Sequence, residues 1–319
     1  MTARQLTRGI LIAATTAVLG IGAMTAPAGA APLPRPATQG NGGAVRLHTN
    51  VTSFGPARPA PQGSSTKENP APRPETVVRP NYEKSTILYG PLNIGPYEAY
   101  QAWVDCPAGM VATGGGESNT SAGGIFPHDS YALDNGAGWQ VTVSNNSSVS
   151  ATYTVNAVCV NGLNSYRQVR GKDLLPANGA GGVAATCAPN ELVLGGGGFS
   201  DTINNHAVTY PYPSANSWWY GMHNLDGVQR TITTQAMCGG YNGSYQVLNG
   251  SYSDVAPGHV ATAVVYCPVG TSVTSGGGGG GDGTFITDSY PDPSEGWRVY
   301  AYNSTTSPGV VSADVVCVG

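Results

Sequence analysis

The stretch CPAGMVATGGGE, residues 106–117, places three consecutive glycines shortly after a cysteine. Similar stretches begin at Cys187 (CAPNELVLGGGG) and at Cys267 (CPVGTSVTSGGGGGG), so the first cysteine recurs at intervals of 81 and 80 residues. Self-similarity at such a period is the sequence signature of a repeat architecture. We therefore predict three copies of one unit, at residues 85–165, 166–243 and 244–319.

Other residue types recur with the same period. After each glycine run a tyrosine is followed by a tryptophan, then by an asparagine six residues later and by a second cysteine fourteen residues after that. The matching residues are Tyr131, Tyr210 and Tyr290; Trp139, Trp218 and Trp297; Asn145, Asn224 and Asn303; and Cys159, Cys238 and Cys317. Because the last two spacings hold without an insertion, we expect these residues to have the same structural role in each copy.

The repeats are predicted to consist of strands. Apolar and polar residues alternate from each tryptophan, and again before each second cysteine, with a polar turn beginning at the asparagine between them. This period of two is typical of half-buried strands joined in a hairpin, and the tryptophans are in phase with the apolar positions. The predicted fold class is all-β, with the repeats packed as one pseudo-threefold body or as three small β-domains. The short connections between the repeats favour the closed body.

The cysteines are expected to pair within each copy. If each copy is one structural unit, the disulfides join Cys106 to Cys159, Cys187 to Cys238 and Cys267 to Cys317. Each bond would close a loop of about fifty residues and stabilise the fold by roughly 4 kcal/mol. Zinc ligation is the alternative, but no C-x-x-C pair or histidine cluster accompanies the cysteines. We predict neither a metal nor a cofactor.

The glycine runs are predicted to have a structural role rather than to bind a ligand. A phosphate-binding loop needs a following helix and usually a lysine before serine or threonine, and neither is present. Residues 277–282 fit the glycine-rich calcium repeat formally, but a lone copy cannot form the stacked ligand set. Between strands, glycine permits bulges and close approach of the backbone.

No convergent catalytic set is visible. None of the five histidines occupies the same repeat position in all three copies. Asp129 and Asp288 match between the first and third copies, but the second copy has no acid there, which favours a loop-capping role over ligand binding. Paired-carboxylate hydrolysis would need residues from distant positions and has no support in the sequence. We predict a protein that is not an enzyme.

The first thirty residues resemble a secretory signal. Arg4 and Arg8 precede an apolar run at 10–23 and small residues at 28–30. No later segment approaches the roughly 18 apolar residues that a membrane span requires. We expect a secreted, extracellular protein whose cysteines meet an oxidising compartment.

Residues 31–84 are predicted to form a disordered arm rich in proline and glycine. They carry seven basic and three acidic residues, whereas residues 85–319 carry five basic and fifteen acidic residues. The repeats therefore lack the basic footprint that binding to nucleic acid requires. Within the arm, residues 44–54 (AVRLHTNVTSF) form an apolar strip of Val45, Leu47, Val51 and Phe54. The strip is either a chance patch in a linker or a strand that pairs with the open edge of a partner.

The second copy has extra aromatic residues. They are Tyr210, Tyr212 and Trp219, which give this copy more aromatic rings in this region than the other copies have. Exposed aromatic rings at these positions would stack on sugar rings, so a carbohydrate-binding, lectin-like module is the alternative function. A protease inhibitor, an enzyme and a surface structural protein are further alternatives with less support.

Two family resemblances follow from this layout. The three β repeats resemble the β-prism of vitelline membrane outer layer proteins and related lectins, because each is bounded by cysteines and carries glycines and a strand tryptophan. They are also similar to secreted bacterial proteins with C…GGG…GW…N…C modules. The signal, the arm and its strip at 44–54 resemble the adaptor subunit of umbrella toxin particles. These resemblances imply a compact non-catalytic body and an arm that docks in a lectin-bearing or toxin-bearing secreted partner. A cell-surface glycan is the partner that the lectin-like alternative implies.

Overall fold

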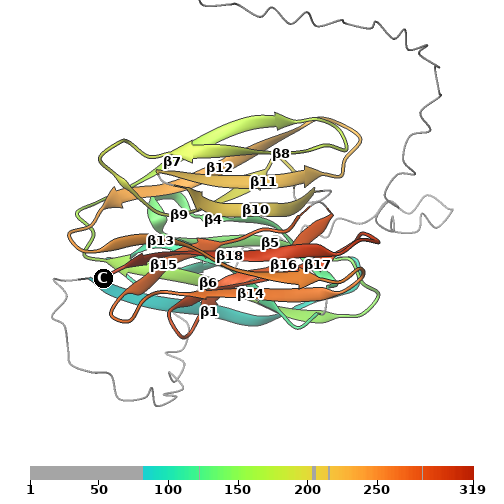
Figure 1. Cartoon of the computed structure of the whole chain (residues 1–319), viewed down its shortest axis with the longest axis horizontal. Helices are drawn as coiled ribbons and strands as arrows, with labels where there is room; N and C mark the ends of the chain where they lie inside the picture. Colours follow the sequence, from blue (N-terminus) through green and yellow to red (C-terminus); the bar gives the residue numbers. More distant parts are fainter. Residues whose placement is uncertain (1–81, 122, 203–205, 215, 282) are drawn as a thin grey trace, which may run out of the picture. The chain divides into compact units, whose positions relative to one another are not determined.

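A computed structural model of the chain describes residues 82–121, 123–202, 206–214, 216–281 and 283–319 (Figure 1). The predicted signal and the predicted strip Val45, Leu47, Val51 and Phe54 lie outside these residues. Apart from one short 3-10 turn, Asp134–Gly136, the regular structure of the described part is entirely β-strand. The predicted all-β class is therefore confirmed.

Each copy of the repeat contributes six strands. In the first copy they are β1 (Glu83–Ile94), β2 (Ala99–Asp105), β3 (Val111–Asn119), β4 (Ile125–Ala132), β5 (Gly138–Asn145) and β6 (Ala151–Asn161). In the second they are β7 (Ser165–Leu175), β8 (Ala180–Thr186), β9 (Leu192–Ser200), β10 (His206–Ser214), β11 (Ser217–Asn224) and β12 (Arg230–Gly240). In the third they are β13 (Tyr245–Val255), β14 (Val260–Tyr266), β15 (Ser272–Gly277), β16 (Thr284–Asp292), β17 (Gly296–Asn303) and β18 (Gly309–Val318).

The strands of one copy form two antiparallel three-stranded sheets. The first, sixth and third strands pair in one sheet, and the second, fifth and fourth pair in the other, in all three copies. The strand that contains each tryptophan is the central strand of the second sheet. The hairpin expected from the sequence is absent, because the strands before and after the polar turn lie in different sheets.

Sheets of different copies then join edge to edge. Strand β3 pairs with β16 through Glu117 and Ser289, and β4 pairs with β9 through Ser130 and Gly198. These joints make two six-stranded sheets, and β4 and β9 lie side by side in Figure 1. At the third joint, between β10 and β15, the Gly278 amide donates to the Pro211 carbonyl at 2.6 Å. The first copy thus shares a sheet with each of the other two, and hydrogen bonds join the second copy to the third. The three copies therefore make one closed pseudo-threefold body and not three separate domains.

Packing explains the glycine runs. A Cβ added to the glycine nine residues after the first cysteine of each copy would lie under 3.0 Å from the indole ring of the same copy, as at Gly115 and Trp139, Gly196 and Trp218, and Gly276 and Trp297. A Cβ added to the next glycine would collide with a backbone carbonyl of another copy, as at Gly116 and Ser289, Gly197 and Ser130, and Gly277 and Pro211. Glycine is required at both places because the tryptophan ring and the neighbouring copy approach the backbone too closely for a side chain.

The recurring asparagines tie two turns together. In each copy the side-chain amide donates to a carbonyl at or just after the end of the first strand and to another four residues along the polar turn. The donor–acceptor pairs are Asn145 to Gly95 and Val149, Asn224 to Pro176 and Val228, and Asn303 to Val255 and Ser307, all between 2.7 and 3.1 Å. Each asparagine is fully buried, so its role is to satisfy backbone groups of the turns.

The three predicted disulfides are confirmed. They join Cys106 to Cys159, Cys187 to Cys238 and Cys267 to Cys317, with Cα–Cα distances of 5.6, 5.5 and 5.6 Å. Each links the end of the second strand of a copy to its sixth strand, and so joins the copy's two sheets.

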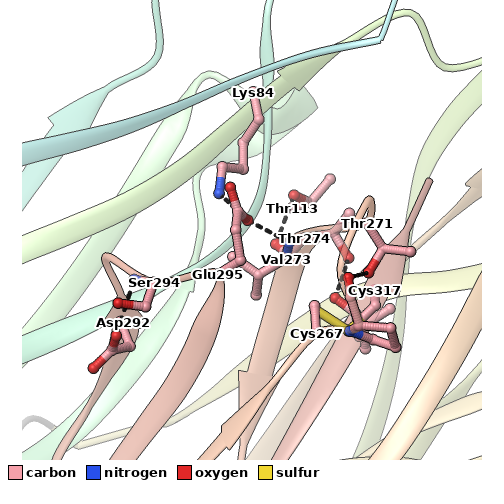
Figure 2. Close-up of polar contacts among 12 residues, drawn as sticks. Lys84, Thr113, Cys267, Thr271, Val273, Thr274, Asp292, Ser294, Glu295 and Cys317 are labelled. Carbon is pink, nitrogen blue, oxygen red and sulfur yellow. Dashed lines mark hydrogen bonds and ion pairs between the residues drawn. A yellow bond between two sulfur atoms is a disulfide. The ribbon is translucent and has the colours of Figure 1, made fainter. Parts of the chain in front are cut away.

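Residues 82–84, which the sequence analysis assigned to the arm, pack against the repeats. Tyr82 is buried with its ring 5.3 Å from that of Tyr241, and Glu83 opens β1 opposite Asn161. The Lys84 ammonium lies 2.5 Å from Glu295 Oε2, which also accepts from the Val273 amide (Figure 2). Residues 82–84 therefore belong to the first copy and not to the arm, since strand pairing with β6 continues past the point where the composition changes.

Candidate functional site

The residues that recur in every copy are buried. Trp139, Trp218 and Trp297 are at most 1% exposed, and each stacks over the glycines of its own copy. The Trp139 indole donates to Ser130 Oγ at 3.0 Å, and the Trp297 indole donates to Ser289 Oγ at 2.9 Å. In the second copy Pro211 occupies the position of these serines, and no described residue accepts from Trp218 Nε1.

The predicted sugar-stacking residues lie on β10 and β11. Tyr212 pairs with Trp219 across the two strands, and both side chains are half-buried. The Trp219 ring lies over Gly182 of β8, where a Cβ would meet it at 2.8 Å. The backbone of Tyr210 pairs with Gly221, and the structure does not describe the Tyr210 side chain. The structure therefore places Tyr212 and Trp219 together on one face of the sheet.

The register of β10 corrects one sequence match. Tyr131 and Tyr290 stand opposite the residue after their tryptophans, and the tyrosine in that place in the second copy is Tyr212, not Tyr210. The sequence alone cannot show the difference because two tyrosines separated by one proline follow the glycine run.

The partner of that tyrosine differs in each copy. In the first copy the residue opposite is Gln140, whose side chain donates to the Tyr131 hydroxyl. In the third copy it is Arg298, which forms an ion pair with Asp292 at 2.7 Å. Trp219 takes the same place in the second copy. Of the three copies, only the second presents an apolar ring at this position.

Buried carboxylates mark two of the joints between copies. Asp129 accepts from the Ser200 amide at 3.0 Å, and Asp288 accepts from the Asn119 amide at 2.6 Å. Each therefore caps the end of a strand that belongs to another copy. The capping role expected for the two aspartates is the one that the structure shows, but it acts between copies.

A third buried carboxylate, Glu117, was missed by the sequence analysis. It is 1% exposed, at the joint of β3 with β16. Burial, followed by the charge of Asp288, raises the pKa of Glu117 well above its ordinary value. A signal was available: the corresponding residues after the other cysteines are Gly198 and Gly278.

The joint between the first and third copies is expected to weaken as the pH rises from about 4 to about 7. Burial raises the pKa of Asp288 to about 7, against the hydrogen bonds that lower it. The folded protein then holds a proton that the unfolded chain releases, so the free energy of unfolding falls by up to about 1.4 kcal/mol per pH unit across this range. Asp288→Asn should remove this contribution, as measured by thermal unfolding at several pH values, whereas Asp173→Asn, at an exposed position, should keep the wild-type slope. Equal slopes for wild type and Asp288→Asn would contradict the assignment.

One serine and one histidine form a close pair. His128 Nε2 lies 2.7 Å from Ser144 Oγ, which is also 3.1 Å from Asn146 Oδ1. His128 is 4% exposed and Ser144 is 7% exposed, so a substrate cannot reach the hydroxyl in this structure. The pair therefore provides no accessible nucleophile.

Another cluster brings Cys187, Cys238 and Glu191 together. Both sulfurs are committed to a disulfide, and Glu191 binds the guanidinium of Arg167 at 2.5 Å. The cluster is fully explained by these bonds, so it offers no thiolate to a metal.

Across the described residues, no helix combines the length and the apolar character needed to pass through a membrane. No protein-family model matches the chain, and no curated protein matches its sequence.

Proposed function

We propose that the chain is a secreted, non-enzymatic adaptor of an extracellular protein complex, which docks a partner through residues 44–54 of its arm. The observation that carries the proposal is the attachment of the arm. Lys84, the third residue of the described part, is bonded to Glu295 of the third copy while its strand pairs with β6 of the first. The strand that follows the arm in sequence is thereby bonded to two copies at once.

The way the body uses its residues supports the same proposal. Its recurring tryptophans, asparagines, cysteines and glycines hold the fold together, which leaves the arm and the outer faces of the sheets for recognition. The strip Val45, Leu47, Val51 and Phe54 has the alternation that suits addition to a sheet edge. Its resemblance to an umbrella-particle adaptor makes a lectin-bearing or toxin-bearing subunit the first partner to test.

Replacement of Val45, Leu47, Val51 and Phe54 by serine is expected to abolish capture of the partner, because the apolar contacts of the added strand are lost. The measurement is a pull-down from the producer's culture medium, with captured proteins identified by mass spectrometry. Val77→Ser with Val78→Ser, elsewhere in the arm, is the matched control and should retain capture. A truncation for the same purpose should stop at residue 81, because removal of Tyr82 and Lys84 would damage the body.

Equal capture by the serine variant and the wild type would refute docking through this strip. Capture of nothing by either protein would refute the adaptor proposal for that medium.

A carbohydrate-binding module is the second candidate, and the adjacent half-buried rings of Tyr212 and Trp219 favour it. On a glycan array, Trp219→Ala should weaken binding of any captured glycan roughly tenfold, since a stacked ring is lost. Tyr252→Ala removes a ring that is 72% exposed on β13 and should leave binding unchanged. A wild-type protein that binds no glycan, or a Trp219→Ala variant that binds as well as wild type, would argue against this function.

A further inference from the structure

The three copies meet around a small central cavity. Its lining includes matching residues of every copy: the glycines Gly115, Gly196 and Gly276, and the strand residues Ser130, Pro211 and Ser289. The cavity therefore lies on the pseudo-threefold axis. Its volume is about 20 Å³, which is room for one water molecule and little more.

The lining departs from threefold symmetry in its polar groups. Glu117 stands where the other copies have glycine, and Tyr220 stands where they have Val141 and Val299. Trp218 lacks the serine partner that the other two tryptophans have. All three departures bring a polar atom to the same cavity.

These polar atoms are buried and unpaired. Glu117 Oε1, Tyr220 Oη and Trp218 Nε1 have no hydrogen-bond partner among the described residues, and each side chain is at most 1% exposed. A buried polar group without a partner is strongly disfavoured, and three around one cavity require a common explanation. The charge of Glu117 also contributes to a raised pKa of Tyr220, after burial and Asp129, which places the two groups within electrostatic reach.

We propose that the axial cavity is a binding site for a single water molecule, bonded to Glu117, Tyr220 and Trp218. The indole N–H can only donate, so the ligand must accept a hydrogen bond. A metal ion cannot accept one, whereas water accepts from the indole and also bonds to a carboxyl in either protonation state. Because Glu117 comes from the first copy and the other two residues from the second, the water links the copies at the axis. This inference does not rest on the proposed function.

A crystal structure of the whole secreted protein at about 1.5 Å resolution tests the site directly. We expect one peak in the cavity at hydrogen-bond distance, about 2.7–3.2 Å, from Trp218 Nε1, Tyr220 Oη and Glu117 Oε1. An empty cavity, direct bonds among the three side chains, or a peak at the 2.0–2.4 Å distances of a metal ion would overturn the proposal.

Thermal unfolding provides the second test. Tyr220→Phe removes one bond to the water and should lower the melting temperature by about 2–4 °C. Trp218→Phe removes another such bond together with part of a fully buried ring, so it should lower the melting temperature further. Because they share one water, the double variant should lose less than the sum of the two shifts. The pair Trp218→Phe and Tyr153→Phe, the latter outside the cavity lining, should be additive and serves as the control. Additive shifts for the Trp218 and Tyr220 pair would overturn the proposal.

Discussion

Replacing Gly197 by alanine is expected to reduce the free energy of unfolding by about 3 kcal/mol or more, enough to deplete the folded protein in the culture medium. The added Cβ would lie under 3.0 Å from the Ser130 carbonyl and from Tyr131 Cα. Both contacts are backbone atoms of another copy, and neither can rotate away as a flexible side chain would. The joint of β9 with β4 must therefore open to admit one methyl group.

The matched control is Gly227→Ala. No atom lies within 4 Å of the Cβ that this change adds, and Gly227 is exposed in a turn, so its effect should stay within about 0.5 kcal/mol. Urea denaturation of the two variants and the wild type makes the comparison. If Gly197→Ala unfolds at the same urea concentration as wild type, the close approach of the two copies is wrong.

The glycine requirement is specific to position within the run. Ser275 in the third copy stands eight residues after its first cysteine, the place held by Gly114 and Gly195 in the other copies. A side chain is thus accommodated there in one copy, while the two following positions are glycine in all three. Alignment of the copies on their first cysteines already shows this difference in the sequence. The tolerance holds for the third copy alone, because a Cβ added at Gly114 or Gly195 would lie under 3.0 Å from a backbone carbonyl of another copy.

The period of the sequence predicted a large part of the fold. Spacing between cysteine, tryptophan and asparagine was enough for the disulfide pairs and the equivalence of the copies, and the alternation of apolar and polar residues predicted the strands. It could not predict the joints between copies, because β3 with β16 and β4 with β9 are each defined by one residue pair. Nothing about Glu117 or Ser289 alone shows that they face each other across 172 residues of chain.

The prediction of a hairpin after each tryptophan was wrong for a related reason. Alternation shows that a strand is half-buried but does not show which sheet covers it. In the structure, β5 and β6 face each other from two sheets, with Asn145 securing the turn between them. Likewise, the unpaired indole of Trp218 depends on Pro211 in the neighbouring strand, a contact that requires the register of β10 with β11.

Removal of the Cys267–Cys317 disulfide by alanine at both positions is expected to lower the free energy of unfolding by about 4 kcal/mol. The bond closes a loop with a sequence separation of 50, and in the loop-entropy model its loss frees the unfolded chain by this amount. Cys317 is fully buried, so the lost sulfur also leaves a small space in the core. The change lies in the third copy alone.

All three copies should nevertheless lose stability together. The third copy shares one sheet with the first through β16 and bonds to the second at Gly278 and Pro211, so its unfolding would expose edges of both. Calorimetry of the variant should therefore show a single transition at a lower temperature, with equal calorimetric and van't Hoff enthalpies. Three independent β-domains would behave differently: one transition would move, and two would stay at the wild-type temperature. Observing that split would mean that the joints between copies contribute little, whereas a single shifted transition would make the shared sheets the source of the body's cooperativity.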